Sequence, residues 1–381
     1  MNAFTFQVPQ NILFGMGCLE RLPELLSKSG SRHTLIISDR GLERLGAVER
    51  IIRLCEAGGV AHTEYLDVMP NPTDRCVDAA VECYRQCGAT SIVALGGGSP
   101  MDVAKAVGVL VTHGGHIMDY EGAGRVPGPI VPAVVAIPTT AGTGSEVTAF
   151  SVIVDEARAY KLTVFSYELI PRYALLDPSM IMTLPPSVAA STGVDAMIHA
   201  MEAYLSRDAS PFSDAMAEKA LELIGGNLRA FTACRENEQA AGAMLVGAMF
   251  AGIAFAWARL GNVHAMSHPV SALFGVAHGV ANAILLPTVL EYNALADTGR
   301  YARLLYLLTG RREENFRPQM LVDEIRSLLT ELGLPTRLSE VGVTEEAIPH
   351  MAADAMKSGN VLANPRQSVQ RDIEELYRKA M

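Results

Sequence analysis

The first half of the chain alternates short apolar runs with segments of helical periodicity. Four of the apolar runs are bounded by polar or turn-forming residues, as buried strands are: TLIISD (34–39), SIVALGGGS (91–99), PAVVAIPTT (132–140) and FSVIVD (150–155). Helical patterns follow the first two runs, at residues 43–57 and 101–110. Strands that alternate with helices predict a parallel sheet covered by helices.

The pattern changes after ALLDPSM (174–180). The chain continues in long Ala-, Leu- and Met-rich segments interrupted by single Gly or Pro residues, which predicts an all-helical second domain from about residue 185. One segment, residues 240–258, has nineteen uncharged residues in a row. Most of them are Ala and Gly, which contribute little transfer free energy, so we interpret the segment as a buried helix and not as a membrane span.

Charge and cysteine content narrow the possible functions. The 381 residues include 31 Lys and Arg against 41 Asp and Glu, a formal net charge of -10, with no run of basic residues. A nucleic-acid partner is therefore not expected. The first residues, MNAFTFQVPQ, lack the basic and apolar regions of a secretory signal, and the six cysteines form no CxxC pair. We expect a cytoplasmic protein with reduced thiols and no membrane partner.

Two loops after predicted strands have the composition of phosphate-binding turns. In LGGGSPMD (95–102), glycines follow a strand and open a helix, so that backbone N–H groups at the helix N-terminus can meet a pyrophosphate. The same residues could also form an ordinary tight turn between a strand and a helix. PTTAGTGSEVT (138–148) favours the phosphate interpretation, because it places hydroxyl groups and glycines after a second strand.

Asp39 ends the first predicted strand. In a dinucleotide-binding fold, a carboxylate at a strand end accepts hydrogen bonds from the adenosine ribose and repels a 2′-phosphate, which favours NAD over NADP. The alternative is that Asp39 caps the helix that follows it. The neighbouring Arg40 keeps NADP as the less favoured possibility.

Histidines are crowded into one apolar segment of the second half. His264, His268 and His278 lie there within fifteen residues, although the whole chain has nine histidines. Asp195 and His199 are four residues apart and therefore share one face of a helix. A single histidine on an apolar face is usually a core residue, but burying several imidazoles costs free energy unless they have partners such as a divalent cation. The residues predict a metal site without showing which histidines are its ligands.

Taken together, these motifs resemble those of the iron-containing alcohol dehydrogenase family. The resemblance extends from about residue 5 to the end of the chain and is carried by GGGSPMD, PTTAGTGSEVT, GVDAMIHAMEAY, HAMSHPVSALFGVAHGVANAILLP and NPR (364–366). It implies a Rossmann-like α/β dinucleotide-binding domain, residues 1–184, and an all-α metal-binding and substrate domain, residues 185–381, in a dehydroquinate synthase-like fold. It also implies a divalent metal at the cleft between the domains and hydride transfer between NAD and a small alcohol, aldehyde or ketone.

The resemblance further assigns roles to individual residues. It makes Asp195, His199, His264 and His278 the metal ligands, and His268 an unliganded histidine near the reacting carbon. The expected metal is Fe(II), with Zn(II) or another divalent ion as alternatives, and a homodimer or higher homo-oligomer is expected. The expected cofactor contacts are Asp39, Asn71, Gly97, Gly98, Ser99, Asp102, Thr139, Thr140, Thr143, Phe150 and Lys161.

Other interpretations of the same sequence stay open. Glycerol dehydrogenases share the fold but use three metal-binding residues, so the presence of all four ligand positions argues against a polyol enzyme of that type. A nucleotide-binding assembly protein that has lost turnover is another alternative. Small differences from the family pattern, at Ser271, Ala272 and Ala277, are expected to leave the ligands in place. Arg259 either binds an anionic group of the substrate or pairs with an acidic residue on a neighbouring helix.

Overall fold

The computed structural model describes residues 10–158 and 160–381. These residues form two compact units. The first, the α/β unit, comprises residues 10–140 and 144–183, and the second, the helical unit, comprises residues 141–143 and 184–381. Within the helical unit, Gly142 lies so close to Thr192 that a Cβ at this glycine would be 2.8 Å from Thr192 Cβ.

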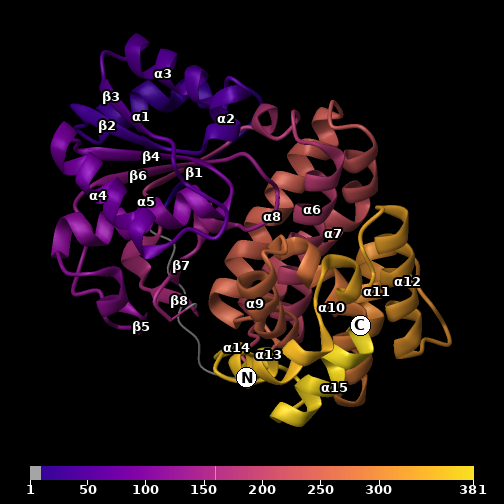
Figure 1. The fold of residues 1–381 in the computed structure, drawn as a ribbon. Helices are drawn as coiled ribbons and strands as arrows, with labels where there is room; N and C mark the ends of the chain where they lie inside the picture. The colour runs from indigo at the N-terminus through magenta and orange to yellow at the C-terminus, as the bar shows by residue number, and fades with distance from the viewer. Residues whose placement is uncertain (1–9, 159) are drawn as a thin grey trace. The chain divides into compact units, whose positions relative to one another are not determined.

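A six-stranded parallel sheet forms the centre of the α/β unit (Figure 1). Its strand order is β1-β9-β6-β4-β2-β3, and each neighbouring pair is parallel. The parallel sheet predicted from the alternating pattern is therefore confirmed. The strands are β1 Asn11–Phe14, β2 His33–Ile37, β3 Ala61–Tyr65, β4 Ser91–Gly96, β6 Ala133–Pro138 and β9 Tyr173–Leu176.

Helices cover both faces of this sheet, because successive side chains of each strand point to opposite faces. Ile36 of β2 and its partner Val93 of β4 belong to the core under α1 and α3, whereas Leu35 and Ile92 belong to the core under α4 and α5. The single helix expected over 43–57 is divided in two, since Gly46 has a φ of 76°. The helices are α1 Leu22–Lys28, α2 Arg40–Arg44, α3 Ala47–Ala57, α4 Asp74–Cys87 and α5 Gly98–His113.

The run at residues 150–155 forms a strand, but it does not join the parallel sheet as expected. This strand, β7 Phe150–Asp155, pairs antiparallel with β8 Tyr160–Phe165, and β5 Gly122–Ala123 completes a separate three-stranded sheet. Alternate residues of β7 are buried, as in an antiparallel sheet with one covered face. A run of six apolar and polar residues is too short for this alternation to be distinguished from a fully buried strand.

The helical unit is built from α6 to α15, as the sequence predicts. The helices α6, α7 and α8 pack against one another. Of the described helices, α8 is the one that is long and apolar enough to cross a membrane, and 72% of its most apolar stretch is buried in the unit, as in a core helix. The helices are α6 Pro186–Leu205, α7 Pro211–Ala233, α8 Glu238–Ala258, α9 Asn262–Phe274, α10 His278–Asn293, α11 Arg300–Thr309, α12 Pro318–Glu331, α13 Ile348–Ala355, α14 Asn360–Ala363 and α15 Gln370–Ala380.

Candidate metal centre and cofactor loops

Three helices bring one carboxylate and three imidazoles together in the helical unit. Asp195 and His199 lie one turn apart on α6, His264 lies on α9, and His278 is the first residue of α10. One potential ligand atom from each of these residues lies within 4.8 Å of all the others. Asp195, His199 and His264 are buried, and His278 is partly exposed. We refer to these four residues as the Asp/His cluster.

Close packing of α10 on α6 places His278 beside Asp195. The residue after His278 is Gly279, and a Cβ at this glycine would overlap the backbone oxygen of Ser191 on α6. Only a residue without a side chain allows the two helices to approach this closely. The glycine is therefore part of the reason that the cluster forms.

A buried carboxylate fixes the orientation of His264. Glu202 Oε2 lies 2.6 Å from His264 Nδ1, and Glu202 Oε1 accepts a hydrogen bond of 2.8 Å from the backbone N–H of Val263. With Nδ1–H donated to the carboxylate, Nε2 keeps its lone pair and faces Asp195. Burial lowers the pKa of His264 well below its usual value, which keeps the ring neutral, and burial raises the pKa of Glu202 to about 7.

Asn282, one turn after His278 on α10, shows that the lone pairs of the cluster converge on one place. Its Nδ2 lies 2.6 Å from Asp195 Oδ1, 3.1 Å from His264 Nε2 and 3.1 Å from His278 Nε2. A side-chain N–H group thus stands where these acceptors would also meet a cation. Among the described residues, the buried Nδ1 of His199 has no hydrogen-bond partner. One carboxylate and three imidazoles fit a divalent transition metal.

His268 lies beside the Asp/His cluster but is not one of its four members. Its ring centroid is 5.4 Å from that of His278 and 6.5 Å from that of His264, and the side chain is partly exposed. Phe255 of α8 packs on His199, with 4.6 Å between the ring centroids. The cluster therefore has an apolar side at α8 and a histidine side that is nearer to solvent.

The two glycine- and hydroxyl-rich loops meet at one edge of the parallel sheet. Gly97 is the N-cap of α5, which begins at Gly98, so that the first N–H groups of this helix have no intrahelical partner. The backbone N–H of Thr139, which follows β6, donates to the carbonyl of Gly96, and a Cβ at Gly97 would lie 3.2 Å from Thr140 Oγ1. Gly97, Gly98 and Ser99 are thus brought together with Thr139 and Thr140.

Asp102 and a buried lysine connect α5 to the segment 145–150. Asp102 accepts a hydrogen bond of 2.9 Å from Ser145 Oγ, and Lys105 Nζ donates to Ser145 Oγ at 2.9 Å and to the carbonyl of Phe150 at 2.8 Å. Burial raises the pKa of Asp102 to about 6 and lowers that of Lys105 to about 8. The Asp102 carboxylate therefore has a structural partner, and Lys105 anchors the segment that leads into β7.

The other sequence-predicted cofactor residues lie on several different elements. Asp39 is the N-cap of α2, which is the alternative role that its position allowed, and Asn71 has a φ of 55° in the loop between β3 and α4. Phe150 and Lys161 lie on β7 and β8 of the small sheet. Thr143 belongs to the short segment of the helical unit. Asn71 lies near β8, because the carbonyl of the next residue, Pro72, accepts from the N–H of Val154, which is paired with Lys161. Lys161 in turn lowers the pKa of the Asp102 carboxyl, against the larger effect of burial.

Sequence reasoning missed Glu202 and Asn282. Glu202 follows Asp195 and His199 on the same face of α6, at the seventh residue after Asp195, and Asn282 is four residues after His278. Extending the helical spacing by one more turn from each proposed ligand would have found both residues. Arg259 forms an ion pair of 3.6 Å with Asp208, in the turn after α6, and both side chains are about half exposed. The structure thus favours the interpretation of Arg259 as an ion-pair partner.

Two family models cover nearly all of the chain. The model described as iron-containing alcohol dehydrogenase matches residues 9–178, and the model for the C-terminal domain of the Fe-containing alcohol dehydrogenase family matches residues 189–381. The chain is similar to lactaldehyde reductase of Escherichia coli, with 37% identity over 96% of this chain and 97% of that protein.

Solved structures are similar over the same length. The crystal structure of a 1,3-propanediol oxidoreductase matches with a TM-score of 0.96 and 35% identity over 100% of both chains. The crystal structure of sulfoacetaldehyde reductase from Bifidobacterium kashiwanohense in complex with NAD+ matches with a TM-score of 0.88 and 29% identity, over 100% of this chain and 99% of that chain.

Proposed function

The chain belongs to the iron-containing alcohol dehydrogenase family, and we propose that the Asp/His cluster holds the divalent metal at which its reaction takes place. The protein is an NAD-linked oxidoreductase that interconverts a small alcohol and its aldehyde or ketone. The observation that carries the metal proposal is the convergence of four ligand atoms within 4.8 Å, with Asn282 Nδ2 within 3.1 Å of an acceptor atom of three of these residues.

Asp195, His199, His264 and His278 would hold the metal, and we propose Fe(II) as the ion in this family member. Zn(II) and other divalent first-row ions suit the same ligands. When bound, such an ion supplies Lewis acidity that polarises the oxygen of the alcohol or carbonyl substrate. A bound nicotinamide would supply or accept the hydride at the carbon that carries this oxygen.

His268 is the residue that we propose for proton transfer. Its partly exposed ring lies next to His278 without belonging to the cluster, so a ring nitrogen can exchange a proton with solvent. In the oxidation of an alcohol, the ring would accept the hydroxyl proton, and in the reduction of an aldehyde it would return it.

The edge of the parallel sheet is the proposed position of the NAD pyrophosphate. Backbone N–H groups of Gly98 and Ser99 at the N-terminus of α5 favour a bound anion, and the hydroxyls of Thr139 and Thr140 lie beside them. Asp39 is proposed to bind the adenosine ribose and to favour NAD over NADP. Further proposed contacts are Asn71, Gly97, Asp102, Thr143, Phe150 and Lys161.

A small neutral alcohol, diol or aldehyde is the proposed substrate. The pairing of Arg259 with Asp208 leaves its guanidinium already engaged by a carboxylate. Relatives named for lactaldehyde and for 1,3-propanediol support a short substrate with a second oxygen. We also propose a cytoplasmic homodimer or higher homo-oligomer. The six cysteines, all at described positions, are free thiols, in keeping with a reducing compartment.

The metal proposal is tested by His199→Ala with His268→Ala as the matched control. We expect His199→Ala to lose most of its bound metal and nearly all turnover with short aldehydes and NADH, while NAD still binds. His268→Ala should keep its metal and lose turnover by about 100-fold, because only proton transfer is impaired. Metal content by mass spectrometry and NAD binding by fluorescence are measured on the same samples. Full metal content in His199→Ala would contradict the proposed ligand set.

A further inference from the structure

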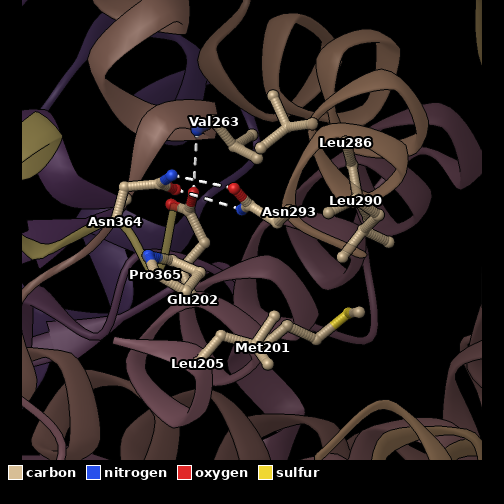
Figure 2. Close-up of a pocket in the computed structure, with 11 residues that line it drawn as sticks. Met201, Glu202, Leu205, Val263, Leu286, Leu290, Asn293, Asn364 and Pro365 are labelled. Atoms are coloured by element: carbon tan, nitrogen blue, oxygen red, sulfur yellow. Dashed lines mark hydrogen bonds between the residues drawn. The ribbon is translucent and has the colours of Figure 1, made fainter. Parts of the chain in front are cut away.

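The first turn of α9, which carries His264, is not capped by the side chain of its own N-cap residue. Gly261 is the N-cap residue and offers no side chain. The backbone N–H groups at the start of a helix need partners from elsewhere, particularly when they are buried, as they are here. Two side chains that are distant in sequence supply these partners, and both are among the residues drawn in Figure 2.

Glu202 of α6 satisfies two of the N–H groups. Its carboxylate accepts from the N–H of Val263 at 2.8 Å and from the N–H of His264 at 3.4 Å, in addition to its 2.6 Å contact with His264 Nδ1. The side chain is 6% exposed. A negative charge at a helix N-terminus also interacts favourably with the helix dipole. One carboxylate therefore holds both the backbone and the ring of His264.

Asn364, the first residue of the NPR motif, satisfies the neighbouring N–H group. Its Oδ1 accepts from the N–H of Asn262 at 3.1 Å, and its Nδ2 donates to the carbonyl of Arg366 at 2.7 Å. The Nδ2 also donates to Asn293 Oδ1 at 2.8 Å (Figure 2). The side chain is 1% exposed. Asn293, near the end of α10, donates back to Asn364 Oδ1 at 3.1 Å. The amide of Asn364 thus uses both its donor and its acceptor groups inside the protein.

Little space remains for the first turn of α9 to move. A Cβ at Gly261 would lie 2.9 Å from Glu202 Oε1 and 2.9 Å from Asn364 Oδ1. The two side chains therefore leave no room for a larger residue at this position. The cavity bordered by Glu202, Asn293 and Asn364 has a volume of about 10 Å³, enough for a single water molecule. Glu202 and Asn364 therefore hold this turn from two sides, and the small cavity leaves their side chains little room to move away.

We propose that Glu202 and Asn364 are positioning residues of the metal centre. Glu202 sets the tautomer of His264, so that Nε2 is the nitrogen available to the metal. Asn364 fixes the position of the helical turn that carries His264. A carboxylate that accepts the second N–H of a ligand histidine also increases the basicity of the ligating nitrogen. This inference rests on the proposed metal binding by the Asp/His cluster, and it gives the NPR motif a role 86 residues away from the last proposed ligand.

The first test compares metal affinity in Glu202→Gln and in wild-type protein. Gln has the same size and still accepts from the backbone, but it loses the charge and the dedicated acceptor for Nδ1–H. We expect the affinity for Zn(II), measured by competition with a chromophoric chelator, to fall by about 10- to 100-fold. Asn364→Ala should lower it by a smaller factor. Co(II) added to the same variants should give an altered absorption spectrum, which a purely structural role away from the metal would not cause.

Glu218→Gln is the matched control for the loss of a carboxylate. Glu218 lies on α7 and accepts hydrogen bonds from Tyr204 and Arg303, away from His264. Its variant should keep wild-type metal affinity. Equal affinity in Glu202→Gln and wild type would overturn the inference while leaving the proposed function standing. A wild-type protein that binds no metal would contradict the proposed function and the inference together.

A second measurement needs no substitution of Glu202. In metal-free wild-type protein labelled with ¹⁵N-histidine, the nitrogen shifts of His264, assigned by comparison with His264→Asn, should show a protonated Nδ1 and an unprotonated Nε2. The opposite tautomer would overturn the inference even if Glu202→Gln fails to fold.

Discussion

Asp39 has a structural task in addition to its proposed ribose contact. Its Oδ1 accepts hydrogen bonds from the backbone N–H groups of Gly41 at 2.7 Å and of Leu42 at 3.0 Å, which caps α2. Because both bonds use Oδ1, a ribose hydroxyl would be held by Oδ2. Arg40 pairs with Glu43 and Asp67, so two carboxylates compete with a 2′-phosphate for its guanidinium.

Asp39→Asn tests the effect of the negative charge on cofactor choice while keeping the hydrogen bonds that cap α2. The amide oxygen of Asn still accepts from the α2 backbone, but the negative charge that repels a 2′-phosphate is lost. We expect the ratio of kcat/KM with NADP to kcat/KM with NAD to rise by about tenfold or more. Asp39→Gly should give the same shift at a cost of a few tenths of a kcal/mol in stability. An unchanged ratio in both variants would show that the ribose does not reach this carboxylate.

Three helices position the Asp/His cluster, and the sequence predicts some of their contributions better than others. The spacing of Asp195 and His199 places both on one face of α6, which a helical pattern predicts without a structure. The capping of α9 by Asn364 could not be predicted in this way, because the two segments are about a hundred residues apart and meet only through tertiary packing. The antiparallel pairing of β7 with β8 was missed for the same reason, since strand partners are not contained in a local pattern.

Gly279→Ala tests the approach of α10 to α6. The added methyl group would overlap backbone of α6, which cannot rotate away, so α10 must shift and carry His278 with it. We expect metal affinity to fall by about tenfold or more and the free energy of unfolding to fall by about 1–3 kcal/mol.

Gly225→Ala is the control for this experiment. Its Cβ would lie 2.7 Å from Leu308 Cα, which forces α7 away from α11 instead. Denaturant unfolding should show a similar loss of stability, with metal affinity unchanged. If both alanine variants bind metal like the wild type, the close approach at Gly279 does not shape the centre.

The molecule as a whole carries a net charge of -10, yet the α/β unit buries a compact group of ionisable side chains. Lys105 is fully buried and Glu146 is 2% exposed. Burial raises the pKa of Glu146 to about 7, and the nearby Lys105 ammonium opposes this rise. Burial lowers the pKa of Lys105 to about 8, which the carboxylates of Asp102 and Glu146 oppose. Net charge alone therefore does not describe how this protein responds to pH.

Glu146→Gln should change the pH dependence of stability. A raised carboxyl pKa stabilises the fold below the unfolded value of about 4.5, and this contribution is lost as the pH rises through about 7. Gln stays neutral, so the variant should match the wild type near pH 4 and exceed it by up to about 3 kcal/mol near pH 8. Urea unfolding across this range measures the difference. A difference that is constant with pH would mean that folding does not raise the pKa of Glu146.

The cap on α9 also determines when, during synthesis of the chain, the first turn of this helix can be completed. α6 carries Asp195, His199 and Glu202, and it leaves the ribosome long before residue 364 has been added to the chain. Until Asn364 arrives, one buried N–H of the first turn of α9 lacks its acceptor and the turn is held from one side only. The nascent chain therefore contains all four members of the Asp/His cluster before it can present them in their final arrangement, and we expect binding of the proposed metal to be a late step of maturation.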